Sequence, residues 1–554
     1  MSLFPGETPQ YAETHFKFKL PWSLLYRPWP EILFDMAFQA VPGITPKLWI
    51  VVRDADRFPV VLESAEIKIE GPDESKKREI KLDIRAEKAV EFFPIDLDGI
   101  APGIYRILPQ ITVSRIKSPN GKNERRTFVR WNLPRLKPKP LLLHVLAEQP
   151  PKAPGYAAGE MHCHTHYSRD HVEFGASPAV LQQAAASVGL DFACCTDHAY
   201  DFAFAEDDYT REAWSPAPRF QALRDEITAL PSGKGFPLML AGEEVSVGNS
   251  KKENVHVTVF APEGYIPGLG DCGRYWLENK PTLSIPQMLE MTSAHCFAAH
   301  PFQQMGILEK FIFRRGYWQS KDLHTDKQHP IRGLQFWNGI RDEGFKLGRE
   351  FWIAELGKGN FLLPIGGNDA HGDLNDTTSV ATPLVSLHHS RDHVFGKVRT
   401  VVKIDCHSGP RSAAIGDRIQ ANTSLDTIGT KSLQSDKNTI VTQETLNEAF
   451  AGENCYITDG PALWWERHEK QIVFHARNTK DFGDGFRYIR IFGRRYTPAG
   501  KLAKNEELCM ESLVAAPANT DITVHIDNFA YLRAECETAT GKFALTSAAR
   551  LVQE

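Results

Sequence analysis

The sequence predicts an α/β protein in which a (β/α) barrel forms the middle of the chain and a β-sandwich lies on each side. The chain has 554 residues, more than one hydrophobic core usually supports. Its hydrophobic period changes near residue 150 and again near residue 460, so we expect domains at residues 1–150, 151–460 and 461–554. Eleven of the twenty histidines fall between His162 and His371, which places the chemistry in the middle domain.

The two end segments show the two-residue alternation of half-buried antiparallel strands. Residues 65–70 and 80–85 alternate apolar and charged side chains, and the same alternation returns at residues 471–475 and 488–492. Asn120-Gly121 adds a hairpin signal to the first segment. We predict an immunoglobulin-type sandwich for the first segment and a smaller β-sandwich for the last.

Strands and helices alternate in the middle segment. Ser177 is a predicted helix N-cap, and Gly189 ends that helix before a buried strand at residues 192–195. Later apolar strands are each followed by polar residues, a pattern typical of a barrel whose site lies at the carboxyl ends of its strands. Residues 409–438 are polar and without pattern, so we predict a loop insertion there.

Composition gives no reason to expect nucleic acid or a membrane as an obligatory partner. The net charge is −5 and the pI is about 6.5. No apolar run reaches the roughly 18 residues of a membrane helix, and no signal peptide is apparent. The nine cysteines are dispersed and lack a Cys-x-x-Cys pair, as in proteins with reduced thiols. We expect a cytoplasmic protein acting on a small molecule, and the oligomeric state is left open.

His162 and His164 stand two residues apart at a predicted strand end. A strand sends residues i and i+2 to one face, so the two imidazoles aim at one point. Neutral imidazole is a good ligand for Zn, Fe or Mn, and the pair is therefore half of a possible metal site. A strand end whose histidines bind nothing explains this pair equally well.

Further candidate ligands follow other predicted strands. They gather in five short groups, which are harder to explain by structure alone than any single histidine. The groups are Thr196-Asp197-His198, Gly242-Glu243-Glu244, Asn254-Val255-His256, Ala299-His300-Pro301 and Asn368-Asp369-Ala370-His371.

Taken together, these motifs resemble those of the polymerase and histidinol phosphatase (PHP) superfamily. The resemblance covers about residues 159–386 and implies a distorted, TIM-like (β/α)7 barrel that holds two or three divalent metal ions, Zn, Mn or Fe. It also implies hydrolysis of phosphoesters. Residues 452–461 and the flanking β domains resemble the metallohydrolase branch that includes carbaryl hydrolase.

The resemblance implies three sets of ligands. One ion would take His162, His164, Glu244 and Asp369. A second would take Glu244, His256 and His300. A third, the most weakly held, would take Asp170, His198 and His371. Family members often have Ser-Asp-Gly where this chain has Ser168-Arg169-Asp170-His171, so Asp170, His171 or neither is the ligand there.

Glu244 is the predicted bridge between two ions, from the Gly-x-Glu spacing, while Glu243 would point into the wall or form a salt bridge there. A bridging hydroxide would be the nucleophile, because binding to metal lowers the pKa of water from 15.7 to about 7. Asp197 is predicted to orient a ligand histidine, with a helix N-cap as the alternative. Glu244, Asp197, His198 and His371 are thus the predicted catalytic residues.

Three functions remain open. The first is a phosphoesterase acting on a small, anionic, phosphorylated substrate, for which Arg314, Arg315, Arg341 and Arg399 are candidate phosphate contacts. The second is a carbamate or carboxylic ester hydrolase with the same metal site, which an apolar pocket poor in arginine would favour. The third is a non-catalytic metal-binding module whose β domains bind a partner.

Overall fold

The computed structural model describes most of the chain. The described residues are 29–72, 75–116, 124–132, 137–168, 175–203, 217–271, 279–324, 330–381, 386–404, 441–496, 503, 506–512 and 516–551. The hairpin signal at Asn120-Gly121, the candidates Asp170 and His171, and the predicted insertion at residues 409–438 lie outside them.

The N-terminal β region, residues 31–145, forms two sheets around an apolar cluster. The strands predicted at residues 65–70 and 80–85 are confirmed within β4 (Val60–Glu70) and β5 (Ser75–Ala86), which pair antiparallel. The sheet orders are β1-β3-β6 and β2-β9-β7-β4-β5, with β8 beside β7. The other bounds are β1 (Glu31–Met36), β2 (Gln39–Ala40), β3 (Lys47–Arg53), β6 (Val90–Asp96), β7 (Gly103–Arg115), β8 (Arg125–Val129) and β9 (Leu141–Val145).

The strand–helix–strand unit after residue 155 is confirmed. β10 (Tyr156–His164) and β11 (Phe192–Cys195) are parallel neighbours, and α2 (Pro178–Val188) connects them. Ser177 caps α2 by accepting a hydrogen bond from the Val180 N–H, and Gly189 ends it in the left-handed region at φ 79°. β12 (Leu238–Ala241) extends the same sheet in parallel.

The predicted (β/α)7 barrel is wrong. The described residues form thirty strands but seven α-helices, arranged in several sheets. Five of those strands make a second sheet in the order β13-β14-β15-β16-β17, of which β13, β14 and β15 are antiparallel. The physical reason lies at residues 249–253: this turn is too short for the crossover that parallel strands need, so β14 returns as a hairpin. The bounds are β13 (Glu243–Gly248), β14 (Asn254–Phe260), β15 (His295–Ala299), β16 (Gly333–Asn338) and β17 (Leu363–Gly367).

The predicted separate C-terminal sandwich also needs correction. Strands β21 and β22 connect β10 to the C-terminal strands, so that one eleven-stranded sheet crosses the predicted boundary at residue 460. A three-stranded sheet, β23-β24-β27, encloses a further apolar cluster with it. The bounds are β21 (Arg399–Lys403), β22 (Cys455–Thr458), β23 (Ala462–His468), β24 (Gln471–Arg477), β25 (Phe486–Arg495), β26 (Glu507–Ser512), β27 (Asn519–His525), β28 (Phe529–Thr538), β29 (Phe543–Thr546) and β30 (Ala549–Arg550).

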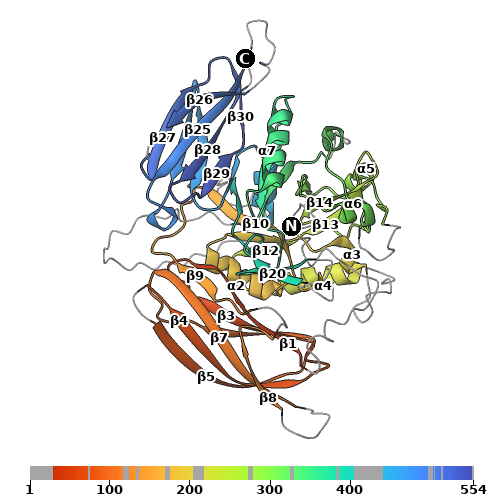
Figure 1. The fold of residues 1–554 in the computed structure, drawn as a ribbon. Coiled ribbons are helices and arrows are strands. Elements are labelled where there is room, and N and C mark those ends of the chain that lie inside the picture. The colour runs from red at the N-terminus through yellow and green to blue at the C-terminus, as the bar shows by residue number, and fades with distance from the viewer. Residues whose placement is uncertain are drawn as a thin grey trace, which may run out of the picture.

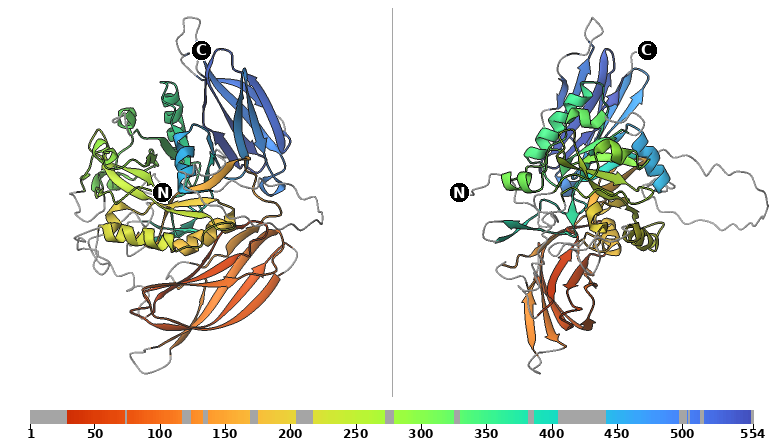
Figure 2. Two further views of the ribbon diagram at one scale, coloured as in Figure 1. Left: turned by 180° about the vertical axis from the view of Figure 1, so that it is seen from behind. Right: turned by 90° about the vertical axis from the view of Figure 1, so that its right-hand side faces the viewer.

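The two end regions lie on opposite sides of the central sheets (Figures 1 and 2). α2 lies on the side of the N-terminal strands, and α7 on the side of the C-terminal strands. None of the described helices is both long enough and apolar enough to cross a membrane. The remaining bounds are α3 (Ala199–Phe202), α4 (Ala217–Thr228), α5 (Ile285–Leu289), α6 (Ile307–Ile312), α7 (Glu343–Leu356), α8 (Gln443–Ala451), β18 (Ala370–His371), β19 (Thr377–Ala381), β20 (Ser386–Ser390) and the 3-10 helices Ser320–His324 and Lys480–Phe482.

Candidate metal centre

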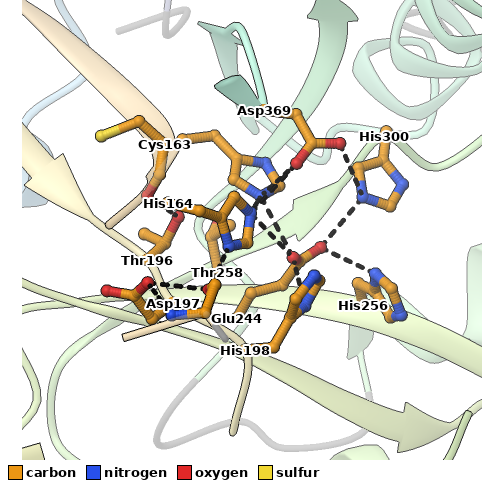
Figure 3. A network of polar contacts seen from close by, with 12 residues as sticks. Cys163, His164, Thr196, Asp197, His198, Glu244, His256, Thr258, His300 and Asp369 are labelled. Carbon is orange, nitrogen blue, oxygen red and sulfur yellow. Dashed lines mark hydrogen bonds and ion pairs between the residues drawn. The ribbon is translucent and has the colours of Figure 1, made fainter. Parts of the chain in front are cut away.

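Eight of the nine predicted metal ligands meet at one buried place, where the carboxylate of Glu244 lies among the imidazoles (Figure 3). The ninth, Asp170, lies outside the described residues. Two of the eight differ from expectation in their local position, because Glu244 and His256 stand within the hairpin β13–β14 rather than beyond a strand end. The eight are His162, His164, His198, Glu244, His256, His300, Asp369 and His371.

The first cluster joins both histidines of β10 to two carboxylates. His164 Nε2 lies 3.1 Å from Asp369 Oδ1 and 3.4 Å from Glu244 Oε2. His162 Nε2 lies 3.3 Å from each of the same two oxygens and 3.3 Å from His164 Nε2. Four possible ligand atoms therefore face one another within 4.8 Å, and this arrangement fits a cation.

The second cluster uses the other oxygen of Glu244. Glu244 Oε1 lies 2.7 Å from His256 Nδ1 and 3.0 Å from His300 Nε2. The two oxygens of this carboxylate thus face different sets of groups. Such a carboxylate is suited to bridge two ions.

The third cluster consists of His164, His198 and His371. The rings of His164 and His371 are stacked with centroids 3.9 Å apart, and His198 Nδ1 lies 2.9 Å from Glu244 Oε2. Nε2 of His371 is buried and has no hydrogen-bond partner among the residues that the structure describes. A buried nitrogen of this kind is a good position for a ligand atom.

Hydrogen bonds behind the histidines fix which nitrogen carries the proton. Gln335 Nε2 donates to Asn338 Oδ1 (3.1 Å), so Gln335 Oε1 accepts from His162 Nδ1 (2.7 Å). His256 Nε2 donates to Asp271 Oδ2 (2.9 Å). In both rings the nitrogen that faces the cluster would offer its lone pair once a cation replaced the proton there, as a metal ligand requires.

Asp197 acts on His164 through Ser168. Its carboxylate accepts from the Ser168 hydroxyl (2.7 Å) and from the backbone N–H groups of Thr165 and Ser168. The Ser168 oxygen in turn accepts from His164 Nδ1 (3.1 Å). Residue His198, not Asp197, stands at the N-cap of α3, and its side chain makes no capping bond. This geometry agrees with the orienting role predicted for Asp197 rather than with the N-cap.

The electrostatics of the site keep its carboxylates charged. Burial alone would raise the pKa of Glu244, but the surrounding imidazoles, above all that of His256, hold it well below its usual range. Burial lowers the pKa of His164, but hydrogen bonds to Asp369 and Glu244 outweigh burial and raise it to about 10. A divalent cation would replace such protons, so binding and protonation compete.

Glu243 contrasts with its neighbour Glu244. Its side chain is fully buried and accepts hydrogen bonds from the Ile266 N–H (3.0 Å to Oε2). Burial raises its pKa well above the usual range. Glu243 is therefore held in the wall of the sheet, where burial disfavours its charged form, on the side predicted for it.

Two ligand positions have left-handed backbone. His300 has φ 24° and Asp369 has φ 52°, a region that non-glycine residues rarely adopt. Such strain is found at functional sites, where the surrounding structure holds it in place. His300 directly follows β15, and Asp369 directly precedes β18. At both positions the side chain points toward the cluster (Figure 3).

Three supporting residues were missed from the sequence. Gln335 and Asp271 fix histidine tautomers, and Glu160 accepts from the N–H groups of His162, Asn368 and Gly396. All three are fully buried. A lone polar residue in an apolar strand was the available signal for Gln335 and Glu160, since such a residue needs a partner.

Two pockets open beside the centre, and His300 lines both. The arginine pocket also contains His256, Gln303, Met305, Arg315 and Trp318. The aromatic pocket contains Phe302, Phe336 and Phe345, with Asn338, Asp342 and His393. The described lining of the aromatic pocket includes no arginine.

The four candidate arginines have different surroundings in the structure. Arg314 is exposed, whereas Arg315 is buried and donates to Asp271 Oδ2 (2.6 Å). Arg341 pairs with Glu537, and Arg399 donates to the backbone oxygen of Val188. Arg315 is thus the candidate that lies against a pocket at the metal centre.

Comparisons with known proteins add little. No protein-family model matches the chain, and no curated protein matches it in sequence. Among solved structures, a β-D-mannosidase from Dictyoglomus thermophilum is similar at 10% identity with a TM-score of 0.20. The match covers 92% of this chain and 65% of that structure. At this TM-score the match says nothing about the fold or activity of this chain.

Proposed function

We propose that this chain is a metal-dependent hydrolase of the PHP type. The observation that carries the proposal is the convergence of eight ligand groups, seven of them buried, into three overlapping clusters, in which Glu244 joins the first to the second and His164 joins the first to the third. A structural role does not explain this density of buried histidine and carboxylate, because buried polar groups cost free energy unless each is paired.

The residues present fit divalent ions. Partners behind the rings of His162 and His256 leave their inward nitrogens available to a cation that replaces a proton, and the pKa values of the carboxylates beside them are held well below the usual range. Imidazole and carboxylate together suit Zn, Mn or Fe, and we propose two or three ions. Bound there, the ions would lower the pKa of a water from 15.7 to about 7 and polarise the electrophile.

We propose a small phosphorylated molecule as the substrate. The arginine pocket supports this choice, because Arg315 lines the same cavity as His256 and His300. Asp271 fixes the Arg315 guanidinium and the His256 ring together, so the anion contact and the ligand would keep a constant separation.

An aryl carbamate or carboxylic ester is the second candidate. The aromatic pocket supports it, because Phe302, Phe336 and Phe345 offer apolar surface with no arginine among the described lining. Asp342 lines this pocket and would oppose an anionic group there.

One experiment separates these candidates. Protein purified without chelator is analysed for metals and then assayed with a chromogenic phosphate monoester, a diester and an aryl carbamate. We expect two or three ions per chain and turnover of the monoester. Turnover of the carbamate alone would favour the second candidate. Metal without turnover of any substrate would favour a non-catalytic module, and protein that takes up no metal would refute the proposal.

A further inference from the structure

We propose that the N-terminal β region is a positioning element of the metal centre, which holds the segment carrying His371 in place. The inference rests on the proposed function only in treating His371 as a ligand. It gives the N-terminal β region a role that neither the sequence motifs nor the comparisons assign.

His371 lies on a strand that is too short to fix its position alone. β18 (Ala370–His371) has two residues, and its partner β10 pairs with both. Gly372 follows with φ 72°, so the chain turns away from the sheet directly after the histidine. The position of His371 then depends on what holds the residues after the turn.

Those residues, 374–376, make several hydrogen bonds to the N-terminal β region. The backbone of Leu374 donates to Asp35 Oδ2 (2.9 Å), and its oxygen accepts from the Phe38 N–H (3.1 Å). Asp376 Oδ2 accepts from Arg130 Nη2 (2.9 Å). Leu374, Asp35, Arg130 and Asp376 are all buried, so water does not compete for these bonds.

Asn375 is the centre of this contact. Its side chain is fully buried and donates to the backbone oxygens of Leu142 (2.7 Å) and Met36 (3.3 Å). Its Oδ1 accepts from the Leu142 N–H (3.0 Å). The Asn375 side chain therefore hydrogen-bonds to two N-terminal strands from a position four residues after His371.

The test compares two buried contacts of the N-terminal β region in the full-length protein. Asn375→Ala removes the contact to the His371 turn. Ser187→Ala is the matched control: it removes the bond from Ser187 Oγ to the backbone oxygen of Gln39 (2.7 Å), which links the same region to α2. Zn²⁺ affinity is measured for each ion by competition with a chromogenic chelator.

We expect Asn375→Ala to weaken the most weakly held ion by about 10- to 100-fold, the usual effect of removing support behind a ligand. The tighter ions and the control variant should be unchanged. Equal losses in both variants, or no loss in Asn375→Ala, would overturn the proposal. If Asn375→Ala does not fold, Asp376→Asn, which weakens the pair with Arg130, replaces it under the same criteria.

A second readout separates this proposal from the proposed function. In metal-free protein labelled with ¹⁵N-histidine, the His371 ring signal is identified by its loss in His371→Gln. Asn375→Ala should shift or broaden this signal, and Ser187→Ala should not. If wild-type protein binds no metal but the signal still responds to Asn375→Ala, the proposed function fails and the positioning role stands. An unchanged His371 signal in Asn375→Ala refutes the positioning role whatever the metal content.

Discussion

Glu244 and His256 are held by their own strands, whereas His371 is held from outside its strand. The first two face each other across the hairpin β13–β14, where six consecutive residue pairs fix the register. His371 has a two-residue strand and depends on contacts from residues more than 200 positions away. A ladder of backbone hydrogen bonds resists single substitutions, while an arrangement resting on a few side chains does not. We therefore expect metal binding at Glu244 and His256, the hairpin side of the centre, to be lost only when a ligand is substituted. Metal binding at His371, the His371 side, should weaken also when the contacts behind His371 are removed.

The largest effect on activity is expected at Glu244, the proposed bridging carboxylate of the hairpin side. Glu244→Gln removes a charge that both sets of groups face, and we expect kcat/KM to fall by at least about 10²-fold, as for loss of one stabilising charge contact in an active site. Glu243→Gln is the matched control, because Glu243 is buried in the wall and accepts hydrogen bonds from the Ile266 N–H rather than from a ligand histidine. Metal content and steady-state rates measure both. Equal behaviour of the two variants would show that Glu244 is not the bridge.

The histidines of β10 serve both sides of the centre. His162→Ala and His164→Ala should each lose bound metal and activity together, since each removes a ligand from the first cluster. Thermal unfolding of the β regions should change little, because their apolar clusters do not include these side chains. His468→Ala, an exposed histidine of β23, controls for histidine removal. Full turnover in either β10 variant would contradict the proposed centre.

The features of the two sides also differ in whether the sequence could predict them. Spacing brought together His162, His164 and the later groups, because residues i and i+2 of a strand share a face whatever the fold. Spacing could not reveal Asp271, which reaches His256 from a loop fifteen residues on. The predicted barrel is wrong because the polar residues 249–253 form a hairpin turn, and a turn of this length excludes a parallel crossover. The contacts of Asn375 had no sequence signal, since they join distant segments.

A smaller effect is predicted at Asp170 and His171, which lie outside the described part of the chain. Asp170→Ala should lower the metal content by one ion, because a carboxylate oxygen is the missing fourth group beside His164, His198 and His371. His171→Ala should leave the count unchanged. The number of ions per chain is measured for both variants by metal analysis of protein supplemented with divalent metal. The assignment fails if His171→Ala loses the ion instead, or if wild-type protein holds two ions.

The smallest effect is a pH dependence of stability on the His371 side. Burial raises the pKa of Asp35 from 3.8 to about 7, although hydrogen bonds from Leu374 and Met36 and the charge of Arg130 act in the other direction. The folded protein therefore keeps a proton on Asp35 that the unfolded chain has lost. This stabilisation is full below about pH 4 and is lost as pH rises to about 7, by on the order of a few kcal/mol.

Asp35→Asn cannot lose that proton. The free energy of unfolding of wild type minus that of Asp35→Asn should therefore fall as pH rises from 5 to about 7 in urea titrations. Asp98→Asn, at an exposed carboxylate of the same region, should show a constant difference. Among the described residues, Asp35 accepts hydrogen bonds from Met36 and Leu374 and not from the hairpin side, so binding of the ions at Glu244, His256 and His300 should depend on pH in the same way in both variants as in wild type. A constant difference for Asp35→Asn would mean that Asp35 is charged when buried, held by Arg130, and that the contact to Leu374 does not depend on pH.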